Sequence, residues 1–472
     1  MPGKPAMLGW TKCRGGRWNR PARLVMLLAV LGFVGCADSK TSETASTSPD
    51  GAQSQKGLPA VSAADFLRQV LRRYQNASHY RDQGEVRLRI EQDGQLLRQT
   101  APMQVALEGT TIWIAAYDAR LWSDDQQTLG WLADQRTRYH DAQVVVGPVS
   151  TGRPTLSLLL QDPILSERMV AGLGGPPPQL EWLFDPDPMA KLFTDAAADA
   201  IEYQGIDESD GVKCVVVHAV VDRDRYRFWI DPDQSVIRNV DLPVSMAGQA
   251  VQLEGAKVHS LELSLVGATF DPPQEPFELP QMQHFDFPPQ PKYLRALVPL
   301  PPPRPNPRLG SRVPGQKRTD RGVTLMVACH RQTTADAEPQ NIHAVQSLAA
   351  WLAHSPEEVR SRVQPVALVD QAAQRILDQS SVASIGWALL RDDAGRTQQR
   401  IGIDAGQAAA MDASGRLVWV GDPRSPLDIS VLGTVVIDTL AGIDVPQRMR
   451  EQWQSDRSAY QAKLKTLAVP TP

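Results

Sequence analysis

Cysteine is scarce in this sequence: the 472 residues contain only Cys13, Cys36, Cys214 and Cys329. No CxxC pair occurs, so the chain is not a disulfide scaffold and has no strong zinc-type spacing. The motifs GxSxG and HExxH, the P-loop and the dinucleotide-binding glycine pattern are also missing. A net charge of -4 gives no reason to expect a nucleic-acid partner. The sequence therefore indicates no metal and no cofactor.

The rest of the composition is that of an ordinary globular protein, with 42% hydrophobic and 22% charged residues. A chain of this length exceeds one comfortable hydrophobic core, so we expect two folded domains. Many of the 38 prolines lie between 280 and 314, where they separate two segments with different hydrophobic periods. This concentration of proline marks the expected division between the domains.

The N-terminus has the features of a secretory signal. Six basic side chains and no acidic one precede an uncharged apolar run from Leu24 to Cys36. The run is shorter than the roughly 20 residues of a membrane-spanning helix. Residues Phe33-Val34-Gly35-Cys36 resemble a bacterial lipobox, although that family usually has Leu in place of Phe33. The resemblance implies a signal peptide over 1–35 that is removed and a lipid attached to Cys36.

The alternative is that the apolar run stays in place as an uncleaved membrane anchor. In both cases the remaining chain works outside the cytoplasm and is tethered at its N-terminus. Residues 36–61 are rich in Ser, Thr, Gly and Gln, which predicts a flexible tether between the membrane surface and the first domain.

The first folded segment begins at Ser62-Ala-Ala-Asp65, a capping box in its Asp form, followed by apolar residues at helical spacing. From residue 84 the period changes to two, and strand-like runs continue to residue 265, many of them separated by turns that contain Asp, Gly or Pro. One such run covers 138–146, and helical patterns interrupt the series within 156–173. The pattern predicts a large antiparallel sheet with one helix before it and helices inserted midway.

Two stretches in this segment resemble the lipoprotein-carrier superfamily, the LolA-like proteins. The first is Arg225-Tyr-Arg-Phe-Trp-Ile-Asp-Pro-Asp-Gln234, a strand that runs into an Asp-Pro turn and is followed by a second strand. The other is the closing strand over 258–270, with Phe277 and Leu279 after it. The resemblance covers 62–280 and implies a half-open antiparallel barrel around a hydrophobic cavity that accepts lipid acyl chains.

Four residues are candidates for lining such a cavity. Tyr226, Phe228 and Ile230 share one strand face, and Trp113 adds wide apolar surface. The alternative is a filled core, because apolar stripes form cores more often than ligand pockets. The arginines on the opposite faces of these strands are expected to face solvent; they are Arg87, Arg89, Arg225 and Arg227.

Residues 281–320 are expected to form a linker, because their prolines forbid regular helix and central strand. The densest run favours polyproline II, which makes a semi-rigid spacer. After it the pattern becomes strand–helix–strand, with apolar strands near 322–328 and 365–370 and a helix over 341–353. A hairpin with its turn at 412–415 and a helical C-terminus follow.

This second domain, 321–465, resembles the thioredoxin-like fold, an α/β fold. The stretch Met411-Asp-Ala-Ser-Gly-Arg-Leu-Val-Trp-Val-Gly421 is similar to the hairpin of membrane-anchored periplasmic thioredoxins and redoxins. Aligning the first strand with that family puts Gln332 and Ala335 at the two catalytic cysteine positions. The segment 404–408 has no proline where the family has its cis-proline. The resemblance therefore implies a redoxin-like domain without dithiol activity.

Cys329, next to His330, supports a second interpretation, a single activated thiol. The simpler interpretation is a strand-end cysteine that packs as a small apolar residue.

Our main hypothesis is a lipid-anchored envelope lipoprotein on the periplasmic side. It would bind an apolar or lipid-like ligand and use the second domain to dock a protein partner. The alternatives are an envelope thiol oxidoreductase or peroxidase that uses Cys329, and a structural envelope protein with a filled barrel.

Overall fold

The structure, a computed structural model, describes residues 57–92, 95–149, 152–188, 200–221, 224–247, 256–272, 286–314, 322–329, 340–379 and 387–471. These residues form two compact units. The N-terminal unit comprises 57–300 and 459–471, and the C-terminal unit comprises 301–458. The C-terminal unit is thus inserted into the chain of the N-terminal unit, whereas the sequence predicts two consecutive domains, 62–280 and 321–465.

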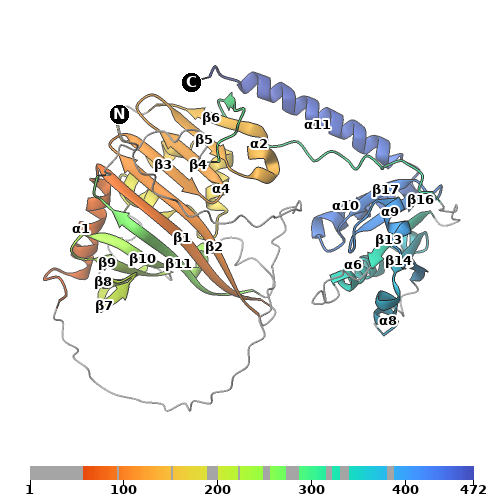
Figure 1. Ribbon diagram of the computed structural model, residues 1–472, viewed down its shortest axis with the longest axis horizontal. Coiled ribbons are helices and arrows are strands. Elements are labelled where there is room, and N and C mark those ends of the chain that lie inside the picture. The colour runs from red at the N-terminus through yellow and green to blue at the C-terminus, as the bar shows by residue number, and fades with distance from the viewer. Residues whose placement is uncertain are drawn as a thin grey trace, which may run out of the picture. The chain divides into compact units, whose positions relative to one another are not determined.

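One twelve-stranded sheet dominates the N-terminal unit (Figure 1). Its spatial order is β12-β6-β5-β4-β3-β2-β1-β11-β10-β9-β8-β7, and every neighbouring pair is antiparallel except β12 and β6. The strands are β1 (His79–Gln92), β2 (Gln95–Glu108), β3 (Thr111–Ala116), β4 (Ala119–Ser123), β5 (Thr128–Leu132), β6 (Gln143–Gly147), β7 (Ile201–Ser209), β8 (Val212–Val221), β9 (Asp224–Asp231), β10 (Val236–Leu242), β11 (Lys257–Thr269) and β12 (Lys292–Leu294).

Helices pack on one face of this sheet, which we call the helix-covered face. They are α1 (Ala63–Gln75), α3 (Leu156–Leu159), α4 (Pro163–Val170) and α5 (Pro178–Phe184). Ser62 is the N-cap of α1, and its hydroxyl accepts a hydrogen bond from the Asp65 N–H at 3.1 Å, as the capping box predicts. The apolar side of α1 and the inward residues of β1, such as Leu88 and Ile90, belong to one hydrophobic core.

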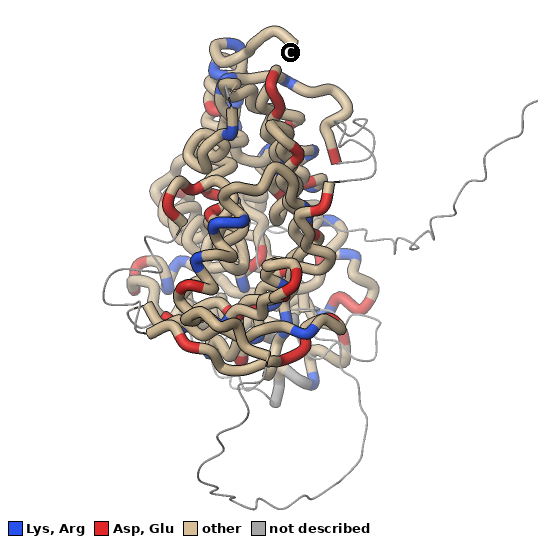
Figure 2. The backbone as a smooth tube through the Cα atoms, turned by 90° about the vertical axis from the view of Figure 1, so that its left-hand side faces the viewer, with Lys and Arg blue, Asp and Glu red and all other residues tan. Residues whose placement is uncertain are grey.

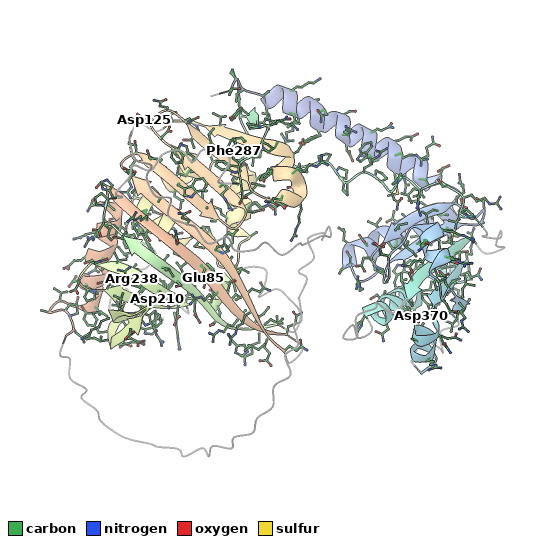
Figure 3. All side chains as sticks on the ribbon, in the orientation of Figure 1. Glu85, Asp125, Asp210, Arg238, Phe287 and Asp370 are labelled. Atoms are coloured by element: carbon green, nitrogen blue, oxygen red, sulfur yellow. The ribbon has the colours of Figure 1, made fainter. Side chains whose placement is uncertain are left out.

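The opposite face, which we call the outer face, has charged residues over β1 and β9. Arg87, Arg89, Arg225 and Arg227 are half-buried or exposed there, as expected for a solvated face. Glu85 lies on the same side of β1 (Figure 3). Basic and acidic residues are interspersed along the chain rather than separated by sign (Figure 2). No helix in the described ranges is long and apolar enough to cross a membrane.

Residues 138–147 differ from the single predicted strand over 138–146. Only the second half is a strand, β6, and the first half is the short segment α2 (Arg138–Ala142). All five residues of α2 have left-handed φ angles between 53° and 61°, although none is glycine. An L-residue is strained in that region, so contacts elsewhere in the fold must hold this turn.

The predicted proline-rich linker, 281–320, is also partly built into the N-terminal unit. Within it, β12 pairs in parallel with β6, and Leu297 and Val298 are buried. Further along the same stretch, Leu309 and Val313 belong to a core cluster of the C-terminal unit. Proline excludes regular helix and central strand, but it permits a short edge strand and apolar packing. The residues from 286 to 314 therefore belong to one or the other folded unit.

The C-terminal unit contains a five-stranded sheet of spatial order β15-β14-β13-β16-β17. Its strands are β13 (Val323–Cys329), β14 (Val363–Val369), β15 (Ala388–Arg391), β16 (Ala408–Asp412) and β17 (Leu417–Gly421). Strands β13, β14 and β15 are parallel to one another, and β16 and β17 form an antiparallel hairpin. The helices are α6 (Gln340–His354), α7 (Glu357–Arg360), α8 (Gln371–Gln379), α9 (Arg396–Ile401), α10 (Pro426–Leu440) and α11 (Val445–Leu467), which continues into the N-terminal unit.

Candidate functional site

Most of the helix-covered face is a filled apolar core. Phe228 and Ile230 of β9, two of the predicted cavity residues, lie there with 1% and 0% of their surface exposed. Tyr226 is half-buried and its ring stacks on Phe228 with the centroids 6.1 Å apart. The ring of Trp182 from α5 lies 6.4 Å from Phe228 on another side. These residues contact other side chains, so this part of the face fits the filled-core alternative.

Trp113, the fourth predicted cavity residue, lies on the outer face and does not join the other three. In β3 the inward residues are Ile112 and Ile114, and side chains alternate along a strand. Trp113 is opposite Trp122 of β4, and its ring centroid is 5.8 Å from that of Trp131. These tryptophans form a separate outer cluster.

Residues 286–293 contribute to that tryptophan cluster. The ring of Phe287 meets Trp131 edge-on with the centroids 4.8 Å apart, and it lies near the β5–β6 end of the sheet (Figure 3). The Trp131 indole N–H donates to the carbonyl oxygen of Asp286 at 3.1 Å. Tyr293 is half-buried and also packs on the cluster. Residues 286–293 of the predicted linker thus cover part of the outer face.

A small pocket remains on the helix-covered face between β4, β5 and β6 and the helices α3 and α4. Its volume is about 170 Å³. The lining is mainly apolar, and its residues include Leu121, Gly130, Val145, Leu159, Leu165, Asp162, Arg295 and Ala296. Space of this size and lining can take a small apolar group, since an engineered apolar cavity of about 150 Å³ binds benzene.

Gly130 of β5 allows helix α4 to approach the sheet closely. A Cβ atom at this position would lie 2.4 Å from Leu165 Cδ1 and 3.0 Å from Val145 Cγ1. Leu165 and Val145 both line the pocket. Any larger residue at position 130 would therefore move Leu165 and change the shape of the pocket.

Asp162 fixes two walls of the pocket at once. Its Oδ1 accepts hydrogen bonds from the N–H groups of Ile164 and Leu165 at 2.9 and 3.1 Å, which caps α4. Its Oδ2 accepts from the Leu297 N–H at 2.7 Å. Asp162 is not among the site residues that the sequence predicts. An Asp before Pro163 is a helix-start signal, but nothing local indicates the contact with Leu297, 135 positions later.

Asp82 is a buried carboxyl group elsewhere on the helix-covered face, with 2% of its surface exposed. It lies in β1 where the pairing with β2 is interrupted between Arg81 and Gly84. Its Oδ1 accepts from the Val105 N–H at 3.1 Å, and its Oδ2 accepts from the Tyr80 hydroxyl at 2.8 Å. Burial raises the pKa of Asp82 to about 7, although these hydrogen bonds act in the opposite direction.

Gln179 of α5 faces the same carboxyl group. Its Nε2 lies 3.3 Å from Asp82 Oδ2 and 3.4 Å from Met103 Sδ. Gln179 has no exposed surface, and its Oε1 has no hydrogen-bond partner among the described residues. With the Gln179 amide group turned over, its Oε1 would accept a hydrogen bond from a protonated Asp82 carboxyl group. Burial favours a protonated carboxyl group in this core, whereas the three donors that face Asp82 favour its charged form.

A larger hollow, of about 410 Å³, is lined by residues of β1, β2 and β11 and by Asp271. It is lined mostly by polar and charged residues, among them His79, Arg81, Glu108 and Asp271. Its charges are of mixed sign, and water can solvate such a lining. The smaller pocket at Gly130 therefore fits an apolar ligand better.

The two cysteines in the described ranges are buried and form no disulfide. Cys329 has 1% of its surface exposed, and burial raises the pKa of its thiol to about 12. Burial likewise raises the pKa of the Cys214 thiol to about 11. A reactive cysteine needs an accessible thiol with a lowered pKa, so Cys329 does not fit the thiol-enzyme alternative. Its place at the buried end of β13 fits packing as a small apolar residue.

Several predicted site residues lie outside the described ranges, namely Cys36, His330, Gln332 and Ala335. Within the described ranges, no group of three or more His, Cys, Asp and Glu residues is arranged to hold a metal ion.

No protein-family model and no curated protein matches this chain. Solved structures similar to it include a DUF1329 family protein from Desulfovibrio piger, with 11% identity and a TM-score of 0.20. That match covers 44% of this chain and 92% of the other. A LolA superfamily protein from Nitrosomonas europaea has 12% identity and a TM-score of 0.18, over 45% of this chain and 96% of the other. TM-scores this low do not establish a common fold, so a functional proposal has to rest on the sheet and its pocket.

Proposed function

We propose that the N-terminal unit binds an apolar, lipid-like ligand, in the manner that its LolA-like sequence stretches imply. The observation that supports this is the apolar pocket of about 170 Å³ between the sheet and the helices α3 and α4. The open twelve-stranded sheet with helices on one face is compatible with a half-barrel. The pocket is smaller than the roughly 300–1,000 Å³ of sites for drug-sized ligands, so the proposed occupant is one end of an acyl chain.

We further propose that the chain is a lipid-anchored lipoprotein of the bacterial envelope, on the periplasmic side. This rests on the sequence features of the signal and on Cys36.

For the C-terminal unit we propose a thioredoxin-like protein-docking module without redox activity. Its three parallel strands and antiparallel hairpin are compatible with that fold, and Cys329 is too deeply buried for thiol chemistry.

Native mass spectrometry of the purified chain, produced without its signal segment, tests the binding proposal. We expect a bound species with the mass of a lipid or fatty acid. Gly130→Ala should decrease its occupancy, because the new Cβ would meet Leu165 at 2.4 Å. Gly433→Ala in α10 is the matched control, since a Cβ there has only an ordinary contact of 3.5 Å with the Trp351 indole nitrogen. An empty wild-type protein would instead support a structural envelope protein with a filled sheet.

A further inference from the structure

The C-terminal end of the chain supports one wall of the candidate pocket from behind, although none of its residues lines the pocket. The chain leaves the N-terminal unit after residue 300 and returns to it at 459. The returning residues lie along the segment that follows β12: Leu294 forms a β-bridge with Ala468, and the Arg295 N–H donates to the Leu467 carbonyl oxygen at 2.9 Å. Arg295 lines the pocket, so a backbone group of the C-terminal segment holds one of its wall residues.

Apolar contacts join the same two segments. The side chains of Tyr460 and Leu464 are buried against Leu294 and Val298, with 7% and 8% of their surface exposed. On the other side of the bridge, the Val469 N–H donates to the Tyr293 carbonyl oxygen at 3.0 Å. The last turns of α11 and the residues after it therefore dock as one piece.

A partly buried polar network fixes this docked piece to β6. Gln143 has no exposed surface; its Oε1 accepts from the Val298 N–H at 2.7 Å and its Nε2 donates to the Tyr460 hydroxyl at 2.9 Å. The Tyr460 hydroxyl in turn donates to Asp141 Oδ2 at 2.6 Å. Lys292 Nζ pairs with the same Asp141 oxygen at 2.7 Å. One hydroxyl group thus connects α11 to two residues on β6 and the turn before it.

The left-handed turn α2 belongs to this network. It contains Asp141, and it also contains His140, whose Nε2 lies 2.9 Å from the Val298 carbonyl oxygen. Left-handed φ values in five consecutive residues other than glycine are unfavourable in an isolated chain. Contacts with Val298 and Tyr460, together with Lys292 and Thr137, hold the turn in this conformation, so the turn and the docked segment stabilise each other.

We propose that residues 459–469 are a latch that holds the pocket wall at Arg295 and Ala296 against α4. This deepens the proposed ligand binding and rests on it, because the latch would control access to that same pocket. Release of the segment would free Arg295 on one side, while Asp162 still holds Leu297 on the other. Arg295 and Ala296 can then move away from α4 while the sheet stays folded.

Hydrogen exchange of the full chain, followed by mass spectrometry, tests the latch. In Tyr460→Phe, amides in peptides covering 295–298 should exchange about tenfold faster, since the buried Gln143 amide and the half-exposed Asp141 carboxylate each lose a hydrogen bond to the hydroxyl group. Thr466→Val is the matched control. Its exposed hydroxyl donates only within α11, to the Ala462 carbonyl oxygen at 3.0 Å, and its loss should leave these amides unchanged.

A second variant, Leu464→Ala, removes apolar contact but no hydrogen bond. It should also accelerate hydrogen exchange of the amides in 295–298. Equal exchange of 295–298 in wild type and both variants would overturn the latch. Calorimetric titration with benzene tests the pocket separately: binding that weakens in Tyr460→Phe supports both proposals. Faster exchange in the two variants, together with a wild-type chain that binds no benzene, would support the latch and count against ligand binding.

Discussion

Asp82→Asn is expected to stabilise the N-terminal unit at pH 8 and to have little effect near pH 4.5. Burial raises the pKa of Asp82 from the usual 3.8 to about 7, so between these pH values the folded state binds a proton that the unfolded state has lost. Its contribution therefore makes the folded state less stable as the pH rises through this window. A shift of about three units corresponds to roughly 4 kcal/mol at pH 8.

Asparagine resembles the protonated carboxyl group in shape and remains neutral at every pH. Its oxygen can accept from the Val105 N–H, and its amide can donate to the orphaned Gln179 Oε1. The expected signal is the difference in unfolding free energy between variant and wild type. It should grow by roughly 3 kcal/mol from pH 4.5 to pH 8 in favour of the variant, because the unfolded carboxyl group is already mostly ionised at pH 4.5.

Urea denaturation at pH 4.5, 6 and 8, read by a short hydrogen-exchange pulse on peptides of β1 and β2, reports the N-terminal unit alone. Asp233→Asn, at an exposed position two residues after the buried Asp231, is the control and should show no such change. A difference between Asp82→Asn and wild type that stays constant over the three pH values would refute the reasoning. It would mean that the Asp82 carboxyl group titrates normally.

Three other outcomes follow from the packing. Phe228→Ala should lower the unfolding free energy by about 3–5 kcal/mol in denaturation experiments. Because Tyr226 is only half-buried, Tyr226→Phe should lower it by less than about 1.5 kcal/mol. Cys329 should react with a thiol reagent only as fast as the C-terminal unit opens, which labelling at increasing denaturant would measure. Burial would raise the pKa of Asp231, but Arg238 at 2.8 Å and backbone N–H groups lower it overall. Arg238→Met should thus destabilise by about 3 kcal/mol at pH 7 and by less as the pH falls below 4, in melts at both pH values.

Local signals predicted the parts of the fold that depend on neighbouring residues. Ser62 caps α1 because a capping box needs only residues within one turn. The turn of the hairpin between β16 and β17 follows from Asp412, whose Oδ1 accepts from the Ser414 and Arg416 N–H groups at 2.9 Å. In both places the interactions that select the conformation lie within a few residues of sequence.

Parts of the fold that depend on distant residues were not predictable. Trp113 was assigned to the wrong face because β3 is buried on both sides, so its hydrophobic pattern does not identify the inward residues. The left-handed turn at Arg138–Ala142 contains no glycine and depends on Val298 and Tyr460, more than 150 positions away. The thioredoxin-like nature of the C-terminal unit and the lipid on Cys36 stay predictions.

The distribution of polar contacts indicates where a ligand would enter. Over the middle of the sheet, α5 is fixed by Gln179 and by Trp182 against a filled core, so entry there would require the loss of well-packed apolar surface. At the β6 end, the pocket wall includes Arg295 and Ala296, and hydrogen bonds of the Arg295 and Leu297 N–H groups hold this segment. Moving that wall exposes less apolar surface than moving a helix, and therefore costs less free energy. A ligand that reaches the helix-covered face should enter at β6, beside the C-terminal segment.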